Sequence, residues 1–172
     1  EMNHGGSLKK KYYDLWARYF AKFIREYEKE GIEIGYLTVQ NEPQAVQTWD
    51  SCIYSSEEES IFVKNHLGPV LEEAGLSGVK IFVWDHNKEE GYQRMKEVIE
   101  DPAARKYVSG TAMHWYTGDH FESIELISYD NLENEIKDVI NKIDSNKLSG
   151  TIVENGNAQK NLSTPYKAEV EI

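Results

Sequence analysis

Three short polar clusters contain the side chains best suited to chemistry: Asn41-Glu42-Pro43, Asp85-His86-Asn87 and His114-Trp115-Tyr116. Each cluster follows a short apolar run, as expected where a strand gives way to a loop. A glutamate at such a place can act as a general acid and base, and Asn41 can donate a hydrogen bond to a substrate hydroxyl. The same tripeptide also suits a surface turn, because Asn and Pro both favour turns. Both interpretations of Glu42 stay open at this point.

The histidines and aromatic residues of the chain suggest two further kinds of site. By residue type, His86 and His114 suit a metal ion, but no HExxH motif or comparable spacing supports one. Four aromatic residues belong either to the core or to a rim where they stack on the apolar faces of sugar rings: Trp49, Trp84, Trp115 and Tyr116. The sequence has neither a glycine-rich phosphate loop nor the GxSxG turn of a serine hydrolase. We therefore predict no metal and no cofactor.

Helices alternate with strands in the pattern that must position these side chains. Apolar residues at steps of three and four predict a helix over residues 8–30, which Gly31 should end. Three apolar runs are typical of strands: residues 32–39, 79–84 and 108–113. This alternation implies right-handed crossovers and a mainly parallel sheet, in which ligands bind beyond the carboxyl ends of the strands. The three polar clusters should therefore converge on one edge of the sheet.

Further elements are predicted between and after these strands. Ser56 and Glu59 have the spacing of a capping box and predict a second helix, which Gly68-Pro69 should kink or interrupt. A helix carrying Met95 follows the second strand, and Asp101-Pro102 begins a short turn. Beyond them, the pattern predicts a helix over residues 132–143 and a possible strand over residues 148–153.

Composition limits the class of protein. The chain has 172 residues, whereas a closed eight-fold β/α barrel typically needs about 250. Its net charge of -11 argues against binding to nucleic acid or to an anionic membrane. No apolar run approaches the roughly 20 residues that span a bilayer. Cys52 has no second cysteine to pair with. The first residues lack the features of a secretory signal, and cytoplasmic and extracellular locations both stay open.

A set of motifs occurs in a fixed order along the chain: Gly6-Ser7-Leu8-Lys9, Trp16-Ala17-Arg18-Tyr19-Phe20, Leu37-Thr38-Val39-Gln40-Asn41-Glu42-Pro43, Asp101-Pro102-Ala103-Ala104-Arg105-Lys106-Tyr107-Val108 and His114-Trp115-Tyr116. This ordered set resembles glycoside hydrolase family 30, the glucosylceramidase family. The resemblance covers roughly residues 5–122. It implies an α/β fold, a partial (β/α)8 TIM barrel in which residues 1–122 supply the fourth, fifth and sixth strands. Residues 123–172 are then a divergent C-terminal region with a helix, a possible strand and a tail.

The resemblance also implies roles for individual residues. The family is made up of retaining β-glycosidases, and Glu42 matches their acid/base. Asn41 matches the residue that binds the sugar 2-hydroxyl, and Tyr116 matches a tyrosine near the nucleophile. Four positions match residues that line or support the pocket: Asp85, His86, His114 and Trp115.

The second carboxylate of a retaining glycosidase is harder to place. It must lie about 5 to 5.5 Å from the first, and the resemblance implies a segment like Phe-Thr-Glu-Gly after a seventh strand. The candidate nucleophile here is Glu154, in Thr151-Ile152-Val153-Glu154-Asn155-Gly156. It follows His114 by 154 − 114 = 40 residues, a longer separation than the family implies.

Two hypotheses therefore stay open. The first is a retaining β-glycosidase of glucosylceramidase type, which hydrolyses β-glucosides such as glucosylceramide by double displacement and is represented here by an incomplete barrel. The second is a non-catalytic remnant or a sugar-binding fragment of such an enzyme. In either case an open parallel sheet leaves two unprotected edges, which predicts self-association or a completing partner chain.

Overall fold

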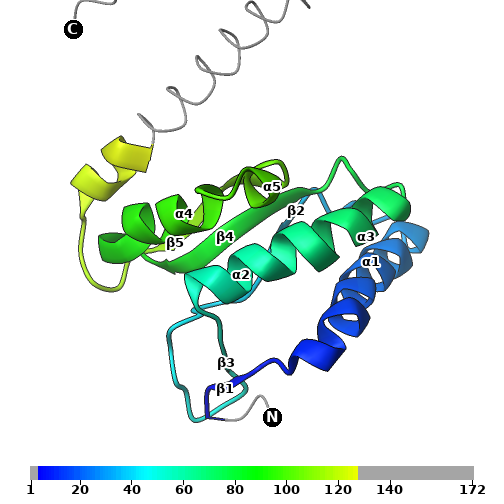
Figure 1. Cartoon of the computed structure of the whole chain (residues 1–172), viewed down its shortest axis with the longest axis horizontal. Coiled ribbons are helices and arrows are strands. Elements are labelled where there is room, and N and C mark those ends of the chain that lie inside the picture. The colour runs from blue at the N-terminus through cyan, green and yellow to red at the C-terminus, as the bar shows by residue number, and fades with distance from the viewer. Residues whose placement is uncertain (1–3, 128–172) are drawn as a thin grey trace, which may run out of the picture. The chain divides into compact units, whose positions relative to one another are not determined.

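Parallel strands and helices alternate along residues 4–127, the part of the chain that the computed structural model describes (Figure 1). The larger sheet has the order β2-β4-β5, and both of its strand pairs are parallel. Its strands are β2 (Tyr36–Thr38), β4 (Lys80–Asn87) and β5 (Val108–His114). A second parallel pair joins β1 (Gly6–Ser7) to β3 (Cys52–Ile53). The predicted α/β class is confirmed, and the described strands form part of a barrel without closing it.

The first long helix is shorter than predicted. Residues 8–30 were expected to be helical, but α1 spans Tyr13–Lys29 after a 3-10 turn, η1, at Lys10–Tyr12. The helix ends as predicted at Gly31, which has a φ of 76° and donates its N–H to Glu28 at 3.0 Å. Its start was placed too early because the residues before η1 follow β1, whose pairing with β3 holds the chain extended.

The second helical segment contains two predicted features, one of them shifted by a residue. It consists of α2 (Ser56–Phe62), the π-helical turn η2 (Val63–Leu67) and α3 (Gly68–Glu73). The predicted interruption near Gly68-Pro69 is confirmed, because the π-helical turn ends there. The predicted capping pair of Ser56 and Glu59 is wrong. Ser55 and Glu58 form the capping box, at 3.1 and 3.0 Å.

The strands also differ in length from the prediction. The strand expected over residues 32–39 pairs only within β2, while the strand expected over residues 79–84 continues to Asn87. Three elements complete the second half of the chain: the 3-10 turn η3 (Lys88–Glu90), α4 (Gly91–Ile99) and α5 (Pro102–Arg105). The Asp101 carboxylate caps α5 by accepting the N–H of Ala103 at 2.9 Å. Residues 121–127 are helical and bury Ile127 near Met95 and Ile99.

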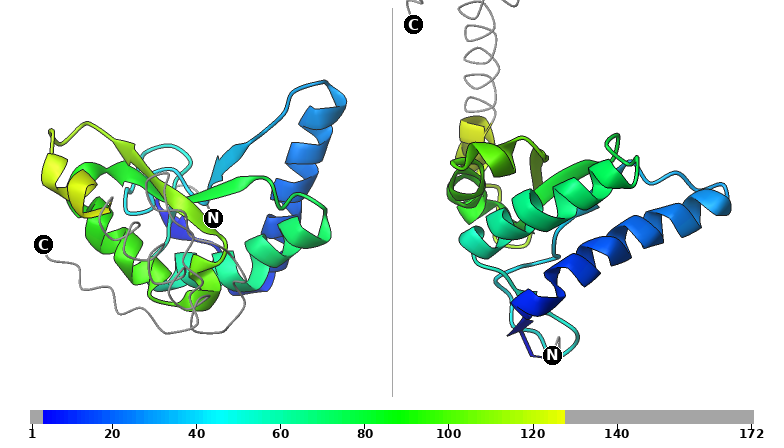
Figure 2. Two further views of the ribbon diagram at one scale, coloured as in Figure 1. Left: turned by 90° about the horizontal axis from the view of Figure 1, so that it is seen from above. Right: turned by 45° about the vertical axis from the view of Figure 1, so that its right-hand side comes forward.

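The two faces of the larger sheet have different surroundings. Figure 2 shows the helices arranged along one face of the strands. On that side Ile81 and Val83 are buried in the main core with Phe62. On the other side Tyr36 stacks on Phe82, with ring centroids 5.5 Å apart, and Tyr36 is largely exposed. The described residues therefore form a core outside the sheet and leave its inner face open.

Several predictions fall outside the described residues. They are the helix over residues 132–143, the strand over residues 148–153, and Glu154. The division of the chain after residue 122 likewise stays a prediction. Within residues 4–127, no helix is long and apolar enough to cross a membrane.

Candidate active site

Glu42 lies just beyond β2 in a loop that is tied to its neighbours on both sides. The residue has a φ of 50°, in the left-handed region that few residues other than glycine adopt. Its N–H donates to the Asp85 carbonyl at 2.9 Å, and the carbonyl of the next residue, Pro43, accepts the N–H of Tyr54 at 3.0 Å. The Glu42 side chain is only 18% exposed. Glu42 is therefore a fixed, partly buried carboxyl group rather than part of a free surface turn.

A β-bulge at the end of β4 presents Asp85. Trp84 pairs with Ala112 and His86 pairs with Met113, so Asp85 is an extra residue between two consecutive pairs. Trp84 and Asp85 both have positive φ, 74° and 44°. A bulky residue rarely adopts this conformation, and it persists only where the surroundings enforce it. The bulge bends the strand and turns the Asp85 carboxylate toward the end of the sheet.

A buried ion pair between Glu59 and Arg94 supports this bulge. The Glu59 side chain is fully buried and accepts the Trp84 N–H at 3.1 Å. Arg94 donates to the same carboxylate at 3.2 and 3.3 Å and to the Tyr54 carbonyl at 2.6 Å. Burial raises the pKa of Glu59, against the opposing attraction of Arg94. The pair therefore provides a hydrogen-bond acceptor for the Trp84 N–H at the point where the backbone of β4 is strained.

His114, at the end of β5, joins the two carboxyl groups. Its Nδ1 lies 3.1 Å from Oε1 of Glu42, and its Nε2 lies 3.1 Å from Oδ1 of Asp85. The Thr38 hydroxyl donates to Oδ2 of Asp85 at 2.7 Å, and Gln47 donates to Oε2 of Glu42 at 3.1 Å. A continuous chain of hydrogen bonds thus runs from β2 through β4 and β5 to the loop after β2. We call these five residues the carboxyl network.

His86 has a separate role beside the carboxyl network. Its ring stacks on Trp84 with centroids 4.9 Å apart, and its Nδ1 accepts the N–H of Asn87 at 2.8 Å. Burial lowers its pKa, mainly by making the charged form harder to solvate. His86 is therefore neutral near pH 7, with its second ring nitrogen carrying the hydrogen.

The aromatic candidates separate into core and surface. Trp84 is buried, whereas the side chains of Trp49, Trp115 and Tyr116 are exposed. Trp115 and Tyr116 stack on each other with centroids 5.8 Å apart, and the Tyr116 ring meets His114 edge to face, also at 5.8 Å. The exposed Tyr116 ring thus lies next to the carboxyl network, and the exposed Trp115 ring stacks on Tyr116.

The structure brings most of the predicted residues together. Glu42, Asp85 and His114 are in direct contact, His86 and Tyr116 lie beside them, and the Tyr116 N–H donates to the Asn87 side chain at 3.2 Å. Asn41 directly precedes Glu42 and is exposed. Trp49 is exposed in the loop between β2 and β3.

Sequence reasoning missed four residues that hold the site: Thr38, Gln47, Glu59 and Arg94. Thr38 could have been found, because alternation places it on the open face of β2 together with Tyr36. Gln47 lies in an irregular loop, and Glu59 resembled an ordinary capping residue, so neither gave a usable signal. Within residues 4–127, no three His, Cys, Asp or Glu side chains are placed to hold a metal ion.

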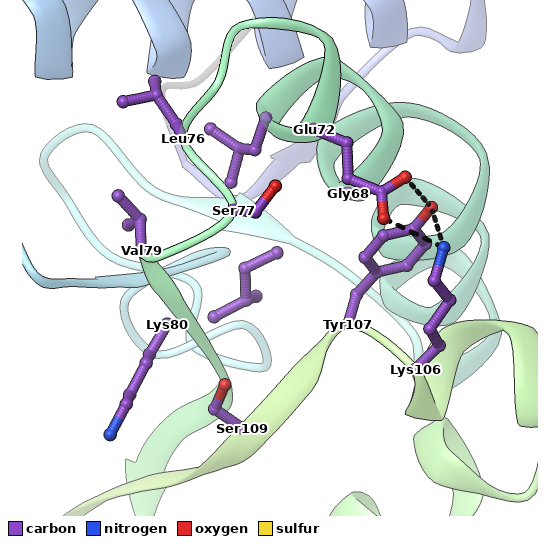
Figure 3. A pocket seen from close by; sticks show the side chains of 11 residues that line it. Gly68, Glu72, Leu76, Ser77, Val79, Lys80, Lys106, Tyr107 and Ser109 are labelled. Carbon is purple, nitrogen blue, oxygen red and sulfur yellow. Dashed lines mark hydrogen bonds and ion pairs between the residues drawn. The ribbon is translucent and has the colours of Figure 1, made fainter.

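A separate cavity of about 160 Å³ lies at the other end of the strands (Figure 3). It is lined by α3 and by the starts of β4 and β5. Tyr107 donates its hydroxyl to Glu72 at 2.9 Å, and Lys106 forms an ion pair with the same carboxylate at 2.9 Å. The Lys106 hydrogen bond lowers the pKa of Glu72. The cavity contains none of the predicted site residues.

Similarity to known proteins agrees with this arrangement. Residues 2–157 match the glycosyl hydrolase family 30 TIM-barrel domain. The chain is 33% identical over 123 residues to the lysosomal acid glucosylceramidase of Mus musculus, covering 67% of this chain and 24% of that protein. It is 37% identical over 106 residues to the endo-1,6-β-D-glucanase BGN16.3 of Trichoderma harzianum, covering 61% of this chain and 21% of that enzyme.

A solved structure shows the same relation in three dimensions. The crystal structure of SrfJ from Salmonella typhimurium superposes with a TM-score of 0.72 at 42% sequence identity. The match covers 75% of this chain and 29% of SrfJ. The chain therefore spans about a quarter of the length of the proteins that it matches.

Proposed function

This chain belongs to glycosyl hydrolase family 30, and from that premise we propose that it supplies the acid/base side of a retaining β-glycosidase site. The observation that carries the proposal is the Glu42 carboxyl group, held by hydrogen bonds to His114 and Gln47 at the carboxyl ends of parallel strands. Ligands bind at this edge in parallel α/β sheets, and in TIM barrels it carries the catalytic groups.

Glu42 acts twice in the proposed reaction. In the first step its protonated carboxyl gives a hydrogen to the glycosidic oxygen, so that the aglycone leaves while a second carboxylate attacks the sugar carbon. In the second step the Glu42 carboxylate takes a proton from water, and this water releases the sugar from the enzyme. Glu154 stays the candidate nucleophile, and its placement about 5 to 5.5 Å from Glu42 is a requirement of this mechanism.

The remaining residues bind and orient the sugar. Asn41 hydrogen-bonds the 2-hydroxyl, and the exposed rings of Trp49, Trp115 and Tyr116 stack on apolar sugar faces. Asp85 and His114 hold Glu42 in place, and His86 supports the rim beside them. The roles of Asn41 and Trp49 rest on their positions and on the family pattern.

We infer a β-glucoside as the substrate, with two candidate classes of aglycone. Glucosylceramide is the first candidate, since the mouse relative is named a lysosomal acid glucosylceramidase. A β-1,6-linked glucan is the second, since the Trichoderma relative, at 37% identity, is named an endo-1,6-β-D-glucanase. Comparing the rates at which one preparation hydrolyses glucosylceramide and the β-1,6-linked glucan distinguishes the two candidates.

The strands that complete the barrel come from outside the described residues. β2 and β5 each pair on one side only within residues 4–127, and this leaves two sheet edges for further strands. We propose that these edges pair with a completing segment or with a second copy of the chain. The division into a barrel segment at residues 1–122 and a divergent region at residues 123–172 belongs to the same proposal.

Replacing Glu42 tests the function. Glu42→Gln keeps the size of the side chain but removes its acid, and we expect hydrolysis of phenyl β-glucoside, whose leaving group needs a proton, to fall by about 10² to 10⁴. Glu89→Gln is the matched control. Glu89 is an exposed carboxylate that accepts a hydrogen bond from the Thr117 hydroxyl and lies outside the carboxyl network. It should retain the parent rate. Equal rates in Glu42→Gln and the parent would overturn the acid/base assignment.

The rival function is sugar binding without catalysis. It predicts that the chain binds glucosides, measured by calorimetry, but does not hydrolyse them. A fluorinated mechanism-based glucoside separates the two hypotheses further, since it should add its sugar to Glu154 and appear in the intact mass. Binding without any adduct or turnover would favour the sugar-binding fragment.

A further inference from the structure

His114 is placed between two carboxyl groups, and each of its ring nitrogens faces one carboxyl oxygen. Both N···O distances are 3.1 Å, and the three side chains are only 18 to 20% exposed. A bare ring nitrogen facing a carboxylate oxygen would bring two lone pairs together. Each contact therefore needs one hydrogen, which makes two hydrogens for the pair of contacts.

A neutral imidazole supplies only one of these two hydrogens. The second resides either on the ring, as an imidazolium between two carboxylates, or on one of the carboxyl groups. Every one of these arrangements has the same net charge of −1. A proton can therefore move across the contact between Nδ1 and Glu42 without changing the charge of the group or breaking either hydrogen bond.

The surroundings make Asp85 the carboxyl group with the shorter supporting hydrogen bond. Oδ2 of Asp85 accepts the Thr38 hydroxyl at 2.7 Å, whereas Oε2 of Glu42 accepts the Gln47 amide at 3.1 Å. A shorter hydrogen bond to a carboxylate stabilises its charged form more strongly. The ring hydrogen then stays on Nε2, because the tautomer of a histidine is set by the partner of the opposite nitrogen.

Two other titratable groups face the His114 ring. The His86 ring lies 6.3 Å away between centroids, and the Tyr116 ring presents its edge at 5.8 Å. His86 accepts a backbone N–H on its Nδ1, and burial lowers its pKa, so it adds no positive charge near pH 7. Neither group supplies a hydrogen to the two contacts.

We propose that Glu42 and His114 share one proton, and that Asp85 fixes the ring so that His114 acts as the positioning residue for this proton. The inference rests on the proposed acid/base role of Glu42. When the O–H bond of Glu42 breaks and an O–H bond forms on the departing oxygen, a carboxylate is left facing the bare Nδ1. The lone pairs of the carboxylate and of Nδ1 repel each other, and this favours the return of a proton from water in the second step. His114 therefore assists both halves of the reaction.

The nitrogen chemical shifts of His114 test this sharing without any need for turnover. The full chain is labelled with ¹⁵N-histidine, and two-bond ¹H–¹⁵N spectra are recorded near pH 7, with the signals assigned by their loss in His114→Gln. We expect Nε2 to be protonated and Nδ1 to have a shift between those of a protonated and a bare nitrogen. Glu42→Gln should move Nδ1 to the bare value while Nε2 stays protonated.

Three further variants sharpen the result. Glu42→Asp keeps the charge but shortens the side chain by one methylene, and it should also move Nδ1 away from the shared value. Asp85→Asn should end the exclusive protonation of Nε2. Glu72→Gln, at the opposite end of the strands, should change nothing.

The possible outcomes separate this inference from the proposed function. A His114 spectrum that is the same in the parent and in Glu42→Gln, or an Nε2 without hydrogen, overturns the sharing even if hydrolysis depends on Glu42. If the shared signal is present but Glu42→Gln leaves hydrolysis unchanged, the proposed function fails and the shared proton stands.

Discussion

The two ends of the same three strands are built differently. At the carboxyl ends, Glu42, Trp84 and Asp85 have positive φ, and the carboxyl network lies above a buried ion pair. At the amino ends, ordinary backbone surrounds a cavity whose ionic contacts, between Glu72 and Lys106, are exposed. Both ends belong to one sheet and share one core.

The difference shows where this chain stores strain. A bulged strand and a left-handed glutamate are costly, and they persist only where nearby groups enforce them. Glu59 and Arg94 support the bulge at Trp84 through buried hydrogen bonds, and the Glu42 N–H donates to the Asp85 carbonyl beside it. The amino ends carry no such arrangement among the described residues, so their substitution should change stability without changing the geometry of the site.

The largest effect on stability should come from breaking the buried ion pair. Arg94→Leu leaves the Glu59 carboxyl without its charged partner in a fully buried place, and we expect a loss of about 3 to 5 kcal/mol in the free energy of unfolding. Urea denaturation measures it. The double variant Glu59→Gln/Arg94→Leu removes the buried charge, keeps an acceptor for the Trp84 N–H, and should recover part of the loss. A loss below about 1 kcal/mol, the level of an ordinary hydrogen bond, would show that the pair does not support the bulge.

A smaller effect is expected at the amino ends. A Cβ at Gly68 would lie 2.4 to 2.5 Å from ring atoms of Tyr107, so Gly68→Ala should lose about 1 to 3 kcal/mol through overpacking. Gly78→Ala is the control, because no atom lies within 4 Å of its added Cβ. Activity per folded molecule should be unchanged in both. If Gly68→Ala also impairs catalysis in the folded fraction, the two ends are coupled.

The smallest effect concerns pH. Because burial lowers the pKa of His86 from its ordinary value of 6.5 in the folded state, the unfolded chain binds a proton more readily just below that pH. The contribution to stability is present above pH 6.5 and is lost as the pH falls through the folded pKa. In His86→Gln, the free energy of unfolding should therefore decline less steeply below pH 6.5. An unchanged slope in denaturation curves would contradict a desolvated His86.

The sequence predicted the order of elements and the edge where the site lies, because periodicity and turn residues are local signals. It placed Glu42, Asp85 and His114 on that edge from three strand ends. It did not predict the bulge, since nothing local announces that Trp84 and Asp85 adopt positive φ. The capping box was displaced by one residue because Ser55/Glu58 and Ser56/Glu59 have equal spacing, and only burial of Glu59 distinguishes them. Thr38 enters the site through a long-range contact with Asp85, and Gln47 enters it through a turn of irregular backbone that no local pattern predicts.

The central claim is that Glu42 gives a proton to the leaving group. The most direct measurement compares the parent and Glu42→Gln on two aryl β-glucosides, one with a strongly acidic phenol as leaving group and one with phenol itself. An acidic phenol leaves without a proton, so kcat/KM, which reports only the steps up to release of the phenol, should fall by about 10² to 10⁴ for the phenyl glucoside and far less for the other. An equal loss of kcat/KM for both substrates, or a parent chain that hydrolyses neither, would contradict the account.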